Sequence, residues 1–171
     1  TKEVIAIFLL GILTFIILYG DFLTYMPFLL SDRFNLSAPQ IGLVFSLSSV
    51  ASAILATQVG KLTSRFGSLA LLKSAFILYL LVNLLIPNIA SLYLFILPVI
   101  LFGCAQALNM PSLQTALANL APDNQRGVFM SLNGMILRLG QTLGPLIIGI
   151  GFTINGLEGA YYLGAVVAVL G

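Results

Sequence analysis

The sequence predicts an all-α integral membrane protein with six transmembrane helices arranged as two inverted three-helix repeats. Three observations predict this fold: the composition, six continuous apolar stretches and an internal repeat. Of 171 residues, 60% are hydrophobic and only 7% are charged, whereas an average soluble domain carries roughly 25% charged residues. The mean hydropathy is +1.12, so lipid must surround most of the chain. The apolar runs lack the alternation of spanning strands, which indicates helices.

The same composition excludes several function classes. A soluble enzyme, a nucleic-acid binder and a disulfide scaffold all need residues that this chain lacks. It has no histidine, five acids and the single cysteine Cys104, so we expect no metal site and no cofactor. An intramembrane enzyme is also disfavoured, because no pair of acids within the spans is available for acid–base chemistry.

Short polar or turn-rich connections separate the apolar stretches, so neighbouring spans should run antiparallel. The expected spans are 4–30, 40–60, 69–87, 91–119, 127–152 and 159–171. The last has 13 residues and rises only about 20 Å, against a hydrocarbon core of about 30 Å. The first residue is Thr1 rather than methionine. We therefore expect residues 1–171 to be one six-span bundle cut from a longer protein.

Basic residues predict the orientation in the membrane. Five of them fall at the N-terminus and in or near the second and fourth connections, and they are Lys2, Lys61, Arg65, Lys73 and Arg126. Arg33 alone falls on the other side. This distribution predicts a cytoplasmic N-terminus in a plasma membrane, the inner membrane if the source is bacterial.

Three short echoes recur at nearly one spacing. Met26-Pro27 matches Met110-Pro111, the Ala-Pro pair at 38 matches that at 121, and GLVFSL at 42 matches GVFMSL at 127, at offsets of 84, 83 and 85. Each copy, about 1–87 and about 88–171, contains three spans. Because three is odd, the second copy must be inverted, as in many secondary transporters.

Small residues form a stripe along the second span, on which another helix can pack closely. They are Gly42, Ser46, Ser49, Ala53, Ala56 and Gly60. The fifth span has a second set of backbone-shaping residues, namely Gly140, Gly144, Pro145 and Gly149. Helix packing explains both sets, and a hinge or gating role is the alternative for the fifth span.

Two charges lie within spans, Asp21 in the first and Arg138 in the fifth. Each costs at least about 3 kcal/mol to bury, so each should face a cavity or a partner. An ion pair or snorkelling is the structural alternative to a substrate or coupling-ion role. On an ideal α-helix Asp21 would share a face with Thr14 and Tyr25, and Arg138 would share one with Gln141.

Polar residues also lie near the middle of the fourth span. Gln106 and Asn109 are i, i+3 neighbours and are candidates to line a substrate pathway, with interhelical hydrogen bonding as the alternative. The third span has few polar residues, which is typical of an outer, lipid-facing helix.

The connection at 60–67 reads GKLTSRFG. It resembles the loop signature of the major facilitator superfamily: glycine, three residues, aspartate, arginine, one residue, glycine, then basic residues. Gly60, Arg65 and Gly67 match. Ser64 replaces the aspartate, and Ser68-Leu69 replaces the basic pair.

The segment 140–149, GQTLGPLIIG, is similar to the fifth-span glycine-proline motif of proton-coupled drug antiporters in that superfamily. Ile148 replaces one glycine of the motif. Members have twelve spans in two halves, so the resemblance implies that this chain is one half. The missing aspartate at Ser64 and the absence of arginine at Val99 favour the C-terminal half, although the fifth-span motif is best known from the N-terminal half.

The resemblance implies secondary active transport of a small molecule by alternating access, coupled to protons and directed outwards. The implied partners are the substrate, protons, the lipid bilayer and the missing six-span half, with no nucleic acid. The first and fourth spans would line the cavity, and the second and fifth would lie between the halves. A non-transporting receptor-like or assembly subunit on the same scaffold is the alternative.

Overall fold

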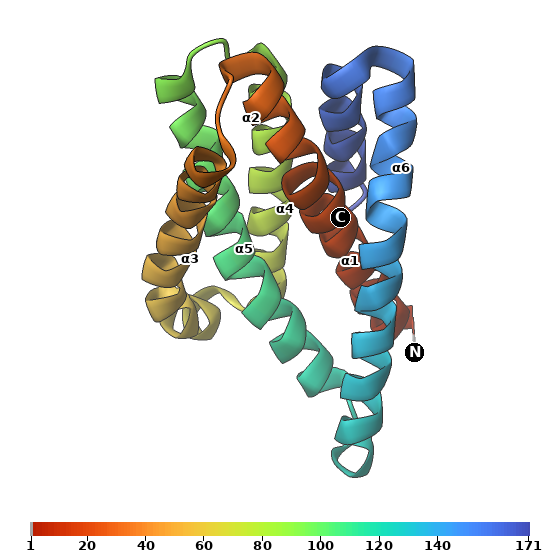
Figure 1. Ribbon diagram of the computed structural model, residues 1–171. Helices are drawn as coiled ribbons and strands as arrows, with labels where there is room; N and C mark the ends of the chain where they lie inside the picture. Colours follow the sequence, from red (N-terminus) through yellow and green to blue (C-terminus); the bar gives the residue numbers. More distant parts are fainter. Residues whose placement is uncertain (1) are drawn as a thin grey trace.

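The computed structural model describes residues 2–171, so Thr1, with which the predicted bundle begins, lies outside the described residues. These residues form a bundle of long helices joined by short turns (Figure 1). The helical stretches are α1 (Lys2–Ile16) with η1 (Ile17–Tyr25) and α2 (Met26–Phe34), α3 (Ala38–Phe66), α4 (Ser68–Leu85) with η2 (Ile86–Asn88), α5 (Leu92–Leu120), η3 (Asp123–Gln125) and α6 (Arg126–Val169). The all-α prediction is confirmed for this part of the chain.

Five stretches of the described chain are long and apolar enough to cross a membrane, where the sequence predicted six spans. The difference lies in α6, which covers the last two expected spans. Its backbone is not helical at Asn155 (φ −143°, ψ 34°) or Gly156 (φ 59°, ψ −148°). There the chain turns back on itself, and the two arms run side by side in opposite directions (Figure 1). A straight helix of 44 residues would be about 66 Å long, twice the hydrocarbon core.

Local sequence sets the helix ends. Gly67 separates α3 from α4, and its φ is +82°. Residues with a Cβ rarely adopt this backbone conformation. Ser37 precedes α3 in a capping box, in which its backbone N–H donates to Gln40 Oε1 at 2.8 Å. Both features place the turns between spans where the polar breaks in the sequence predicted them.

The first membrane crossing contains a π-helix, η1, between two α-helices. Its register is visible at Met26, whose backbone N–H donates to the carbonyl of Asp21, five residues earlier. The hydroxyl of Thr24 likewise donates to the carbonyl of Tyr19 at 2.6 Å. Because i→i+5 bonding winds the chain less per residue than an α-helix, side chains after Ile16 point in directions that α-helical spacing does not predict.

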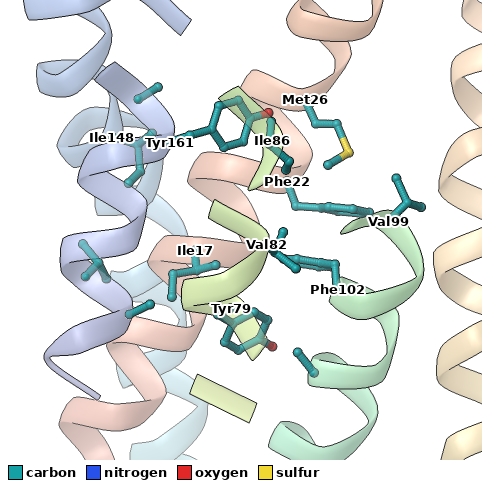
Figure 2. Packing of buried hydrophobic residues seen from close by; sticks show 14 of the residues in the cluster. Ile17, Phe22, Met26, Tyr79, Val82, Ile86, Val99, Phe102, Ile148 and Tyr161 are labelled. Carbon is teal, nitrogen blue, oxygen red and sulfur yellow. The ribbon is translucent and has the colours of Figure 1, made fainter. Parts of the chain in front are cut away.

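The largest apolar cluster lies where η1, α4, α5 and the second arm of α6 meet (Figure 2). Phe22 stacks on Phe102 with ring centroids 3.9 Å apart and an interplanar angle of 2°. Tyr79 and Tyr161 are completely buried in the same cluster. The core of the bundle therefore surrounds η1, whereas α3 packs chiefly against α5 and lies at one edge (Figure 1).

Glycines allow η1 and the first arm of α6 to cross closely. A Cβ on Gly144 would lie 3.0 Å from the carbonyl oxygen of Ile16, and one on Gly20 would lie 2.9 Å from the carbonyl oxygen of Gly144. A Cβ on Gly140 would lie 2.7 Å from the carbonyl oxygen of Ile12. Gly140 and Gly144 thus lie at a close helix contact within the bundle.

The small-residue stripe of the second span behaves differently. All six of its members, from Gly42 to Gly60, are exposed on α3. A Cβ on Gly42 or Gly60 would meet nothing within 4 Å. Within the described residues the stripe is therefore an open surface rather than a helix contact.

Arg33 joins three elements at the end of the bundle opposite the N-terminus. Its Nη1 donates to the carbonyls of Ile86, Pro87 and Ile89 at 3.3, 3.0 and 3.1 Å. Its Nη2 lies 3.8 Å from Oε1 of Glu158. The three carbonyls lie in η2 and directly after it, so this guanidinium holds α2 against the turn that follows α4.

The glycine crossing predicts a strong effect of bulk at one position. Gly144→Leu should destabilise the protein by about 1–3 kcal/mol, because the side chain collides with the backbone of the first crossing. Gly127→Leu is the matched control on α6, since a Cβ there meets nothing within 4 Å. Thermal unfolding in detergent, followed by circular dichroism, measures both. Equal melting temperatures for the two variants would contradict the crossing.

The contacts of Arg33 predict that its hydrogen bonds to carbonyls matter more than its ion pair. Arg33→Leu should cost about 1–3 kcal/mol, since three carbonyls lose a charged donor. Glu158→Gln should cost no more than about 0.5 kcal/mol, because Glu158 is half exposed and its pair is long. The same unfolding measurement compares them, and a larger loss in Glu158→Gln would reverse the assignment.

Candidate functional site

The most unusual polar group in the bundle is the carboxyl of Asp21, in the middle of η1. Asp21 is 3% exposed, and both of its carboxyl oxygens are buried without a hydrogen-bond partner. In η1 this side chain points into the bundle rather than towards its outside. An ionised carboxylate left in such surroundings is costly, so the carboxyl requires a proton or a movement.

Three residues from other helices surround the Asp21 carboxyl. Asn83 comes from α4, and Tyr161 and Gly164 come from the second arm of α6. A Cβ on Gly164 would collide with Oδ2 of Asp21 and would lie 2.6 Å from Oδ1 of Asn83. The space that Asp21, Asn83 and Tyr161 border is too narrow for a water molecule.

Thr14, Asp21 and Tyr25 contact different helices of the bundle. The Thr14 hydroxyl donates to Asn109 Oδ1 on α5 at 3.1 Å, and also to the carbonyl of Leu10 at 2.9 Å. The Tyr25 ring packs on Phe152 of α6, with centroids 5.4 Å apart. The three side chains thus have different surroundings, and the π-helical register of η1 lies between Thr14 and Tyr25.

The polar residues of the fourth span make interhelical hydrogen bonds. Gln106 Oε1 accepts from the Tyr79 hydroxyl on α4 at 2.6 Å, and Asn109 is fully buried against Thr14. Gln106 and Asn109 therefore link helices by hydrogen bonds in this structure. Interhelical hydrogen bonding was the alternative to a role in the substrate pathway. Since α4 supplies the buried residues Tyr79 and Asn83, it is not a purely outer helix, and only one of its faces is exposed.

The second in-span charge lies apart from the first. Arg138 is exposed on the outer face of the first arm of α6, and neighbouring Gln141 is half-buried. Among the described residues, Arg33 and Glu158 form an ion pair. Arg138 does not pair with Asp21. Asp21 thus lies inside the bundle, and Arg138 lies on an exposed face.

The signature residues of the second connection lie at the end of α3. The Arg65 guanidinium packs over the Phe66 ring at 5.2 Å from its centroid, and Gly67 makes the turn. Gly60 is exposed. In the fifth span, Pro145 lies within α6, and a Cβ on Gly149 would lie 2.9 Å from the Tyr25 hydroxyl.

Sequence reasoning did not identify Asn83, Tyr161 or Gly164 as site residues. Asn83 had a signal, because it is one of the few polar residues in the expected span 69–87. Tyr161 and Gly164 had none, since a tyrosine and a glycine are ordinary in an apolar stretch. The described residues contain no group of three or more His, Cys, Asp and Glu side chains that could hold a metal ion.

Comparisons with known proteins identify the family of the chain. The sequence profile of the Major Facilitator Superfamily matches residues 5–171. An uncharacterized transporter of Bacillus subtilis, YybO, is 26% identical over 119 residues, which are 69% of this chain and 27% of that protein. The matched stretch thus spans about a quarter of this relative. The family match points to a family of transporters rather than of enzymes, and the chain belongs to the major facilitator superfamily.

Proposed function

We propose that this chain is one six-span half of a secondary active transporter, which exports a small, partly hydrophobic molecule in exchange for protons by alternating access. Membership of the superfamily supports transport, as does the likeness to a protein described as a transporter. The glycine-proline motif at 140–149 supports the comparison with drug antiporters, and the departures at Ser64 and Val99 favour the C-terminal half.

The observation that carries the proton coupling is the burial of Asp21. Coupling needs a group that changes its charge between two conformations. Both oxygens of the Asp21 carboxyl are buried without a partner. We infer that this carboxyl is neutral here and would ionise when the bundle opens it to water. Among the acids of the chain, Glu3, Asp32 and Glu158 lie at helix ends and are poorly suited to this role.

The open surfaces support a missing half. The small stripe of α3 and the outer face of α6 that carries Arg138 are both exposed. A second six-span bundle would pack on such surfaces, and Arg138 would then face the central cavity, where its permanent charge could attract an anionic group of the substrate. The two repeats, about 1–87 and about 88–171, would supply the two opposed orientations that alternating access needs.

The placement of basic residues supports a cytoplasmic N-terminus in the inner membrane of a bacterium. Lys61 and Arg65 end α3 and Arg126 begins α6, whereas Arg33 ends α2. This proposal includes the second arm of α6 as the sixth span, which returns the chain to the cytoplasmic side.

Cysteine labelling tests this topology. In a variant of the intact protein whose Cys104 is replaced by serine, single cysteines at Ser64 and Asn124 should react only from the cytoplasmic side. A cysteine at Asn35 should react only from outside. All three positions are exposed and lie in or near turns. Reaction of Asn35 and Ser64 variants from the same side would exclude the arrangement.

Replacement of Asp21 tests the coupling. Asp21→Asn keeps the shape of the neutral carboxyl but cannot release a proton. In proteoliposomes of the intact protein, it should abolish substrate accumulation driven by a pH gradient and leave substrate counterflow largely intact. The matched control is Asp32→Asn, which changes an exposed acid at the end of the same crossing and should leave both activities unchanged.

Two results would contradict the proposal. Full gradient-driven accumulation by Asp21→Asn, with unchanged pH dependence, would place coupling in the missing half. Absence of counterflow in the parent protein, for every substrate class tried, would favour the non-transporting receptor-like or assembly role.

A further inference from the structure

We propose that α4 and the second arm of α6 form an internal receptor for the protonated carboxyl of Asp21, in which Asn83 accepts the hydrogen of that carboxyl. This inference rests on the proposed function of Asp21 as the proton site and adds the residues that hold the proton. Asn83 acts as a positioning residue, and Gly164 provides the room.

The orientation of Asn83 leaves an acceptor free. Its Nδ2 donates to the carbonyl of Tyr79 on the preceding turn, at 3.0 Å. Its Oδ1 is buried and has no hydrogen-bond partner. Tyr79 is itself fixed, because it is completely buried and its hydroxyl donates to Gln106. One hydrogen of the amide nitrogen is thus used, and Oδ1 remains a free buried acceptor for a neighbouring donor.

Gly164 brings the acceptor and the carboxyl together. A Cβ at this position would collide with Oδ2 of Asp21 and would lie 2.6 Å from Oδ1 of Asn83. Two buried oxygens without a donor thus converge on one glycine. Two acceptors in such a place repel each other, whereas one proton on Asp21 turns the carboxyl into a donor and satisfies both groups.

The other groups around the pocket leave this proton as the natural donor. From α6, the Tyr161 hydroxyl borders the same space and has no partner of its own, so it can donate to the second carboxyl oxygen. From α5 comes only Phe102, and from α4 come Val82 and Ile86 beside Asn83. Arg33, whose charge acts on Tyr161, is already held by three carbonyls and Glu158.

Infrared difference spectroscopy on the purified full-length protein in lipid tests the receptor directly. The carbonyl stretch of a protonated carboxyl should be present at neutral pH and absent in Asp21→Asn, which assigns it to Asp21. In Asn83→Leu, which cannot accept a hydrogen bond, the band should move to higher wavenumber.

Gly164→Ala provides a second variant, which serves also if Asn83→Leu does not fold. The added methyl occupies the position of the carboxyl, so the Asp21 band should weaken or disappear. Two matched controls should leave the band unchanged. Asn88→Leu removes an exposed asparagine with the same bond to the fourth preceding carbonyl, and Gly134→Ala changes a glycine of α6 whose Cβ would meet nothing within 4 Å.

The outcomes separate the receptor from the coupling. No carboxyl band lost in Asp21→Asn, or a band that Asn83→Leu and Gly164→Ala leave unaltered, would overturn the receptor. An equal shift in Asn88→Leu would overturn it too, because the effect would not be local. If the band behaves as expected while Asp21→Asn still accumulates substrate, the receptor stands and the proposed coupling fails.

Discussion

The close crossing of η1 with the first arm of α6 determines most of the remaining geometry. Gly20 and Gly144 bring two backbones so near that a Cβ on either would meet the carbonyl oxygen of the other helix. In a bilayer the hydrophobic effect does not drive helices together, so close van der Waals contacts at small residues supply much of the packing energy. Because the crossing fixes η1 along its length, the π-helix can be held in place, and its register decides which side chains enter the bundle.

Asp21 enters the bundle as a consequence of that register. The side chain lies among α4 and α6, far from the open face on which Arg138 lies. Its polar neighbours are themselves held by buried contacts: Asn83 by the Tyr79 carbonyl, and Tyr79 by Gln106. Side chains that are linked by buried hydrogen bonds have little freedom to reorient. The protonation state of the Asp21 carboxyl must therefore suit the groups that already surround it.

Much of the fold could be predicted from the sequence, because composition and continuous apolar runs are direct consequences of a lipid environment. Gly67 and Ser37 marked helix ends for local reasons. The site was less predictable. The direction of the Asp21 side chain depends on hydrogen bonds between residues five apart, which no residue pattern in the sequence predicts. That Asn83, Tyr161 and Gly164 surround Asp21 depends on α4 and α6 being neighbours. The exposure of the α3 stripe likewise depends on what packs outside the chain.

The separation of the two charges has a mechanical consequence for the proposed transporter. If a substrate binds at the face that carries Arg138, it does not touch Asp21, so the two must communicate through the helices between them. The first crossing is the common element, since α1 and η1 pack on α6 at Gly140 and Gly144 and also carry the carboxyl. In the proposed mechanism, release of the proton would remove the donor that joins Asp21 to Asn83 and would leave a charge in a pocket without a counter-ion. The carboxyl would then have to leave the pocket, and η1 would have to move along the glycine crossing. Coupling therefore requires that this contact slide rather than break, which small residues permit and larger ones would prevent.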